Sequence, residues 1–147
     1  MRTGSIIAIG AVVAVIGVAI GLSEYNRAPA GAASAVPVHV ISAEHLLLQF
    51  QQDESAATGI FVGQTEQVIQ VNGTIREISA GDGDLRNVIL GTGDPLAGVV
   101  CEFKAADLPA EWKAGDEVEV KGFCKGMLMD VLLQRCVAAD RNKNKNR

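Results

Sequence analysis

The sequence predicts a mostly β protein, built as a small closed barrel of five strands. A helix precedes the barrel, a short helix lies between its third and fourth strands, and an N-terminal helix spans a membrane. Three observations indicate this class. An uncharged apolar run occupies residues 6–22, residues 41–58 have the apolar spacing of a helix, and residues 67–138 hold five short alternating segments separated by turn residues.

The apolar run "IIAIGAVVAVIGVAIGL" at residues 6–22 has no charged side chain. It is apolar on all sides, whereas a buried helix of a soluble domain has one apolar stripe. Its length suits a short transmembrane helix. We expect a retained single-pass anchor, and the alternative is a signal peptide cleaved within "APAGAASA" at residues 28–35. The flanking positive charges place residues 1–5 in the cytoplasm and the remaining domain in the periplasm of a bacterium.

Small residues recur along one face of this predicted helix, at Gly10, Ala14, Gly17 and Gly21. Such spacing lets two helices approach closely in lipid, which predicts a homodimer through the membrane segment. The alternative is that glycine and alanine are simply common in membrane helices.

Residues 23–37 are rich in Ala, Gly, Ser and Pro and predict a flexible tether to a domain at residues 38–140. The domain begins with a helix. Ser42 is a suitable N-cap, Glu44 lies in the first turn, and an apolar face follows at Leu46, Leu47, Phe50 and Ala57. Neither His39 nor His45 belongs to a constellation of catalytic or metal-binding residues.

Five strands are expected after this helix, in the segments "QVIQVNGTIREIS", "LRNVILGT", "GVVCEF", "EVEVKGFC" and "MDVLLQRCVA". Residues 104–116 between the third and fourth predict a short helix. This order is the layout of an OB-fold barrel, and Gly73 within the long first strand suggests a bend that lets it curl across both sheets. Barrels of SH3 type remain an alternative, although they usually lack the inserted helix.

The segments "ISAEHLLLQFQQDESAA", "VIQVNGTIREI", "GVVCEF", "GDEVEVKGFCKG" and "DVLLQRC" together resemble the bacterial OB-fold proteins of the tRNA-anticodon-binding-like (tRNA_anti-like) family. The resemblance covers residues 40–138. It implies the fold and a membrane-anchored or exported protein, but it implies little about function, since similar folds serve unrelated functions. Phe61 stands near the position where the family commonly has a tyrosine.

The motifs of known catalytic, cofactor and metal sites are not found, so we expect no enzyme and no cofactor. The net charge is −4, and −8 without residues 141–147, which disfavours nucleic acid as a ligand of the barrel. Residues 141–147 form a basic tail whose side chains are candidate contacts for a polyanion: Arg141, Lys143, Lys145 and Arg147. The alternative is a solvated, disordered end.

Three functions stay open. A membrane-tethered scaffold that recognises another envelope protein is favoured, because the barrel is acidic and aromatic residues are only 4% of the chain. The alternatives are binding of nucleic acid or another polyanion through the barrel face and the basic tail, and binding of a small ligand or glycan. Nucleic-acid binders of this fold stack bases on aromatic side chains, and here only Phe103 ends a strand of that face.

Three cysteines in an exported domain allow one internal disulfide. In OB topology the third and fifth strands are parallel neighbours, and Cys101 and Cys136 both lie near the ends of these strands. The pair is therefore the candidate disulfide. The expected register places Cys124 opposite Val131 and far from Cys136. Cys101 and Cys136 as reduced core residues remain the alternative.

Overall fold

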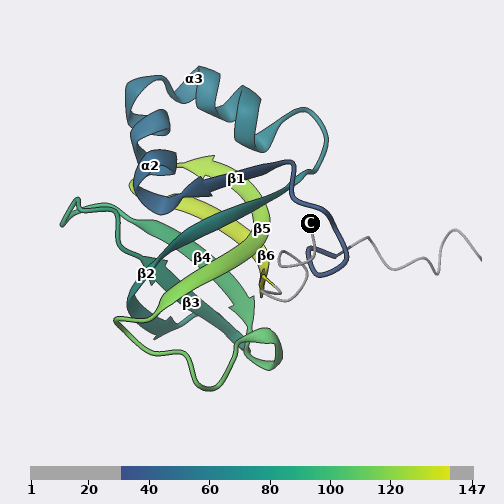
Figure 1. Ribbon diagram of the computed structural model, residues 1–147, viewed down its shortest axis with the longest axis vertical. Helices are drawn as coiled ribbons and strands as arrows, with labels where there is room; N and C mark the ends of the chain where they lie inside the picture. Colours follow the sequence, from purple (N-terminus) through teal and green to yellow (C-terminus); the bar gives the residue numbers. More distant parts are fainter. Residues whose placement is uncertain (1–30, 140–147) are drawn as a thin grey trace, which may run out of the picture. The chain divides into compact units, whose positions relative to one another are not determined.

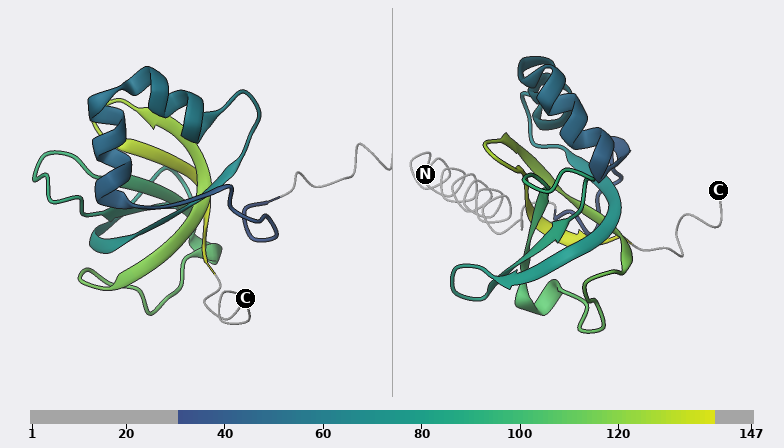
Figure 2. Two further views of the ribbon diagram at one scale, coloured as in Figure 1. Left: turned by 45° about the horizontal axis from the view of Figure 1, so that its top comes forward. Right: turned by 90° about the vertical axis from the view of Figure 1, so that its left-hand side faces the viewer.

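The computed structural model describes residues 31–139 (Figure 1). The predicted transmembrane segment, its small-residue face and the basic tail lie outside this part of the chain. Between residues 31 and 139 the longest helix has ten residues, and none could cross a membrane. Described on their own, these residues form a closed β-barrel with a helical layer over one end (Figures 1 and 2).

The barrel confirms the predicted OB-fold topology. Its strands are β2 (Val68–Ala80), β3 (Leu85–Leu90), β4 (Val99–Lys104), β5 (Glu117–Met127) and β6 (Val131–Ala138), and β1 (His39–Ser42) is added at one edge. The hydrogen-bonded order is β1-β2-β3-β4-β6-β5, and pairing of β2 with β5 closes the barrel. Strands β4 and β6 are parallel, and the pairs β2–β3, β3–β4, β5–β6 and β2–β5 are antiparallel.

Strand β2 serves two partners because it is long and bent. Its first half pairs with β5, and its second half pairs with β3 after a register shift between Ile75 and Glu77. The predicted bend is thus observed, two residues beyond Gly73. Gly73 itself allows close approach, since a Cβ there would lie 3.1 Å from Cβ of Ala43.

The helical layer consists of α2 (Ala43–Gln52), α3 (Glu54–Ala57) and a π-helical turn, η1 (Thr58–Val62). Ser42 caps α2 as predicted, because its hydroxyl accepts a hydrogen bond from the His45 amide at 3.2 Å. The side chains of Leu46, Leu47 and Phe50 are buried against the barrel. The layer closes one end of the core.

Residues 105–116 contain less helix than expected. A single 3-10 turn, η2 (Ala105–Asp107), is followed by an irregular connection. Pro109 cannot donate an amide hydrogen bond, and Gly115 has a positive φ of 95°, so neither suits an α-helix. Trp112 anchors the connection by packing edge-on against Phe103, with ring centroids 5.7 Å apart.

The segment before β1 lies against the outside of the barrel. Ala32 is buried beside Val68 and Phe123. The ammonium group of Lys121 donates hydrogen bonds to the carbonyls of Ala33 and Ala35, at 3.1 and 3.0 Å. The end of the predicted tether therefore contacts the domain through Ala32, Ala33 and Ala35, whereas Val36 is exposed.

Candidate binding face of the barrel

The outer surfaces of β3, β4 and β6 share a row of aliphatic side chains. Ile89 pairs with Val100, and Val100 pairs with Leu132. Their neighbours along each strand, such as Val88, Val99 and Leu133, are buried in the core. Because successive side chains of a strand point to opposite faces of the sheet, the row points outward. All three members of the row are half-buried. A continuous aliphatic strip thus crosses the barrel on the side where OB folds bind ligands.

Two loops that adjoin these strands carry side chains that are largely exposed. Leu96 lies on the loop between β3 and β4, at the left of Figure 1, and is 85% exposed. Leu128 and Met129, in the turn between β5 and β6, are 96% and 78% exposed. We call the six side chains the apolar face: Ile89, Leu96, Val100, Leu128, Met129 and Leu132.

The two loops are fastened to each other. The amide of Gly98 donates a hydrogen bond to Oδ1 of Asp130 at 2.7 Å, and the amide of Val131 donates to the Gly98 carbonyl at 3.1 Å. A Cβ on Gly98 would lie 3.2 Å from Cγ2 of Ile89. The absence of a side chain at Gly98 therefore lets the loop lie close to the strand row.

The loop between β3 and β4 is also ordered internally. The Thr92 hydroxyl donates to the Ala97 carbonyl at 2.8 Å, and the Leu96 amide donates to Oδ1 of Asp94 at 2.8 Å. This hydrogen bond is the main reason why the pKa of Asp94 lies below its ordinary value. Arg76 adds a hydrogen bond from its guanidinium to the Asp94 carbonyl at 3.2 Å. The exposed leucine is thus presented by a rigid loop.

The apolar face carries none of the aromatic side chains of residues 31–139. Phe103, the predicted stacking residue, points into the core and is fully buried, and Trp112 packs on it. Phe123 is 5% exposed, and the guanidinium carbon of Arg135 lies 3.9 Å from the centroid of its ring. Phe50 and Phe61 pack together under the helical layer. The face is aliphatic.

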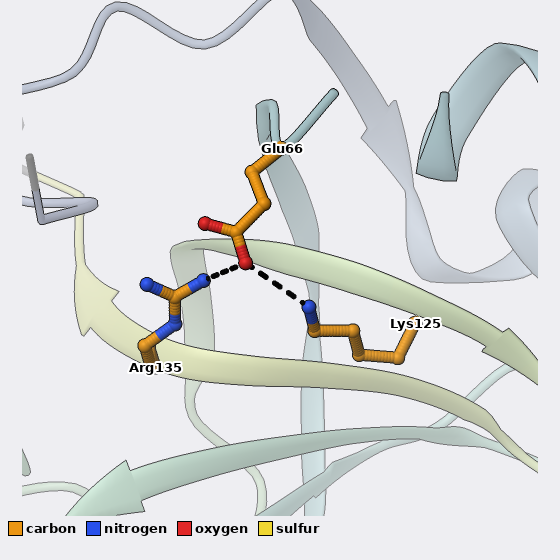
Figure 3. Close-up of polar contacts among 3 residues, drawn as sticks. All are labelled: Glu66, Lys125 and Arg135. Atoms are coloured by element: carbon orange, nitrogen blue, oxygen red, sulfur yellow. Dashed lines mark hydrogen bonds and ion pairs between the residues drawn. The ribbon is translucent and has the colours of Figure 1, made fainter. Parts of the chain in front are cut away.

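A charged cluster lies elsewhere, on β5, β6 and the loop before β2 (Figure 3). Lys125 and Arg135 both contact Oε1 of Glu66, the lysine at 3.4 Å. The hydrogen bond from Arg135, followed by that from Lys125, lowers the pKa of Glu66. Arg135 has a positive φ of 51°, a left-handed conformation that is costly for a residue with a side chain. The cluster joins the loop to the barrel, and exposed ion pairs of this kind contribute little stability.

The three cysteines are buried free thiols. The predicted parallel pairing of β4 with β6 is confirmed, and the thiol of Cys101 lies near enough to Cys136 to affect its pKa. Burial, and after it this contact, raises the pKa of Cys136. The disulfide between the two stays a prediction. The expected register of Cys124 is wrong: it pairs with Leu133, because β5 continues to Met127, which pairs with Val131, so the turn falls at residues 128–130.

The remaining predicted contacts lie outside the described residues. They are the membrane-helix positions Gly10, Ala14, Gly17 and Gly21 and the tail positions Arg141, Lys143, Lys145 and Arg147. Within residues 31–139, His, Cys, Asp and Glu side chains form no group of three that could hold a metal ion. The apolar face itself had a visible signal, since "PLAG" and "MLMD" place large apolar residues inside turns.

A family model described as tRNA_anti-like matches residues 2–138. A crystal structure of a proposed nucleic acid-binding lipoprotein from Klebsiella pneumoniae subsp. pneumoniae is similar, with a TM-score of 0.53 and 15% identity over 68% of this chain and 91% of that chain. At this identity the likeness shows the fold alone.

A weaker likeness is to the structure of yeast Stn1 and Ten1, with a TM-score of 0.42 and 9% identity over 78% of this chain and 69% of that chain. No curated protein matches the sequence.

Proposed function

The chain belongs to the tRNA_anti-like family, and we propose that it is a non-enzymatic OB-fold binding protein whose apolar face recognises another protein of the cell envelope. The single observation that carries this proposal is the aliphatic character of the face. Leu96, Leu128 and Met129 project into solvent from ordered loops, next to a half-buried row on three strands.

Exposed aliphatic groups at this density favour a protein ligand. Burying one such side chain fully is worth about 1.5–3 kcal/mol, and contiguous apolar patches commonly mark interaction sites. The loops are fastened before binding, so little ordering would be needed when a partner docks. A single-stranded nucleic acid would instead need aromatic side chains for base stacking, which the face lacks among the described residues.

The proposal includes a membrane tether through residues 6–22. The apolar run supports it, and the Klebsiella neighbour is described as a lipoprotein, which is also an envelope attachment. Residues 1–100 of the present chain contain no cysteine that could carry a lipid, so the apolar run is the candidate anchor.

Nucleic acid is the second candidate ligand. The name of the family and the description of the Klebsiella neighbour favour it, as do the four basic residues of the tail. The charge of the barrel opposes it, because residues 31–139 hold seven basic and fifteen acidic side chains, a net charge of −8. This candidate requires the tail to supply most of the attraction.

Site-specific photo-crosslinking tests the proposal on the full-length chain in its own membrane. A photoreactive residue is placed at Leu96 or at Leu128, and at the exposed helix position Glu54 as the control. We expect a discrete protein adduct from both loop positions and none from Glu54. The adduct partner is then purified and titrated with the wild-type chain and with the double variant Leu128→Ser, Met129→Ser.

The proposal is supported if the double variant keeps its melting temperature and binds the purified partner at least tenfold more weakly. Each buried aliphatic group that is lost would account for about 1.5–3 kcal/mol, so tenfold is a low bound. Crosslinks to nucleic acid at these positions, or unchanged affinity of the double variant, would overturn it.

A further inference from the structure

A recess lies outside the apolar face, beside the second half of β2. It is a shallow, open recess with a volume of about 610 Å³. Arg76, Glu77 and Ile78 of β2 and Arg86 of β3 line one side, and Trp112 and Lys113 of the connection before β5 line the other. We call this recess the basic hollow.

The positive charges of the basic hollow are not neutralised by ion pairs within residues 31–139. Arg76 donates to the Asp94 carbonyl at 3.2 Å, and Arg86 donates to the Leu85 carbonyl at 2.7 Å. Arg76 also lies near the Asp94 carboxylate and helps to lower its pKa, whereas the hydrogen bond given for Arg86 goes to a neutral carbonyl. Each guanidinium has five N–H donors, so these contacts leave donors that an anion could use. Glu77 is the single acidic residue in the lining.

The concentration of basic side chains in the hollow contrasts with the net negative charge of residues 31–139. Three of the seven basic side chains of residues 31–139 line the hollow, although acidic side chains outnumber basic ones by eight. Guanidinium groups suit carboxylate and phosphate oxygens, since they offer paired donors in one plane. The chemistry of the hollow therefore favours a negatively charged ligand.

The hollow also has an apolar wall. Trp112 is half-buried, and Phe103 fixes its ring edge-on, so part of the indole remains available to a ligand. Ile78 lies in the same lining. A planar ring could contact these side chains while its anionic group meets the arginines.

We propose that the basic hollow binds a small organic anion, in which a phosphate or carboxylate group is joined to a planar ring. Ile89, Leu96 and the rest of the apolar face contribute no residue to this lining. The inference therefore does not rest on recognition of a protein partner and can be tested separately.

Trp112 provides the readout, because it is the only tryptophan of the chain. The full-length protein in detergent is titrated with phenyl phosphate and with benzoate while its fluorescence and the heat of binding are followed. Inorganic phosphate lacks the ring and benzyl alcohol lacks the charge. We expect saturable binding of at least one ring-bearing anion, at least tenfold tighter than either control compound; the tighter of the two anions identifies the preferred group.

Variants test whether the fluorescence change and the heat come from a ligand bound in the basic hollow. We expect Arg76→Gln and Arg86→Gln each to weaken binding at least tenfold. Lys125→Gln removes the same charge from the distant cluster with Glu66 and should leave the affinity unchanged. This control matters because Trp112 also borders a second recess, lined by Glu111, Asp116, Glu117 and Glu119, where an anion would be repelled.

Melting temperatures close to that of the wild type show that each variant is folded. The proposal is overturned if neither ring-bearing anion produces saturable fluorescence change or heat, or if the arginine variants and Lys125→Gln bind equally well. It is also overturned if inorganic phosphate binds as tightly as phenyl phosphate, since the indole wall would then have no part.

Discussion

At Gly122 on β5 the barrel leaves no room for a side chain. A Cβ there would lie 2.6 Å from Sγ of Cys136 and 3.2 Å from the Gln134 carbonyl oxygen. Such contacts force the neighbouring strand to shift, at a cost of about 1–3 kcal/mol. We expect Gly122→Ala to lower the free energy of unfolding by that amount, as measured by denaturant titration.

Gly59 provides the matched control for this substitution. Its φ is not positive and a Cβ there would meet nothing within 4 Å. Gly59→Ala should be neutral or stabilise by up to about 1 kcal/mol, because alanine loses less conformational freedom on folding. Equal effects of the two substitutions would show that the contact between β5 and β6 is looser than described.

Titration of Glu66 should show whether Arg135 or Lys125 contributes more to lowering its pKa. Its hydrogen bond from Arg135 is the largest cause of the lowered pKa, and that from Lys125 is second. We expect the carboxyl carbon of Glu66 to titrate below the ordinary value of 4.5 in an NMR experiment. Arg135→Gln should move the midpoint toward 4.5 further than Lys125→Gln does.

The same shift fixes the sign of a pH effect on stability. A carboxyl group whose pKa is lowered by folding stabilises the protein above its unfolded pKa, and the contribution disappears as the pH falls through the folded pKa. Glu66→Gln should therefore lower the stability above about pH 4.5, and this loss should disappear as the pH falls through the lowered pKa of Glu66. An equal loss at all pH values would contradict this electrostatic origin.

At the scale of elements, the alternating segments predicted the five barrel strands to within three residues at each end. The alternation is strong because one face of each strand packs in the core, as Val88 and Leu90 do on β3. Residues 105–116 were harder, since their helical composition is overridden by Pro109 and Gly115. The bulges in β5 and β6 had no local signal, and β5 continues to Met127, so the turn lies later than expected and Cys124 pairs with Leu133 in place of Val131.

Strand β1 was also not predicted, because its partner is remote. Four residues, His39–Ser42, pair in parallel with residues of β2 that lie thirty positions further along the chain. Their composition also suits the approach to the helix that Ser42 caps. Long-range pairing of a short segment leaves too little local pattern to detect.

The packed segment before β1 gives a prediction at this scale. Ala32 is 2% exposed beside Val68 and Phe123, whereas Ala33 is exposed. Ala32→Asp would bury an unpaired carboxylate, so the segment should leave the barrel. With a penalty of about 2 kcal/mol, hydrogen-exchange protection within residues 31–38 should fall roughly 30-fold.

Ala33→Asp carries the same charge change one position along and should leave this protection unchanged. Comparable loss in both variants would mean that general repulsion by the acidic barrel, and not burial of Ala32, controls the segment.

For the whole molecule, the sequence predicted the fold better than the site. The closed barrel follows from the order of strands, and its charge follows from composition. The apolar face depends on which loops meet, and Gly98 joins Asp130 across 32 positions, so no local pattern shows that Leu96 and Leu128 belong to one surface. The basic hollow likewise unites residues from β2, β3 and the connection before β5.

The net charge of −8 on residues 31–139 gives the last prediction, because it should make nucleic-acid binding depend on the tail. Arg141, Lys143, Lys145 and Arg147 can neutralise up to four phosphates. The logarithm of the affinity for single-stranded DNA should then fall with the logarithm of salt concentration with a slope of about −2.8 at most. We expect a variant with all four residues changed to Gln to lose this binding in a fluorescence anisotropy titration, while Lys121→Gln keeps it. Tight binding by the four-fold variant that persists at high salt would instead show that the barrel holds a nucleic-acid site strong enough to overcome its own charge, and the protein-recognition proposal would lose its electrostatic support.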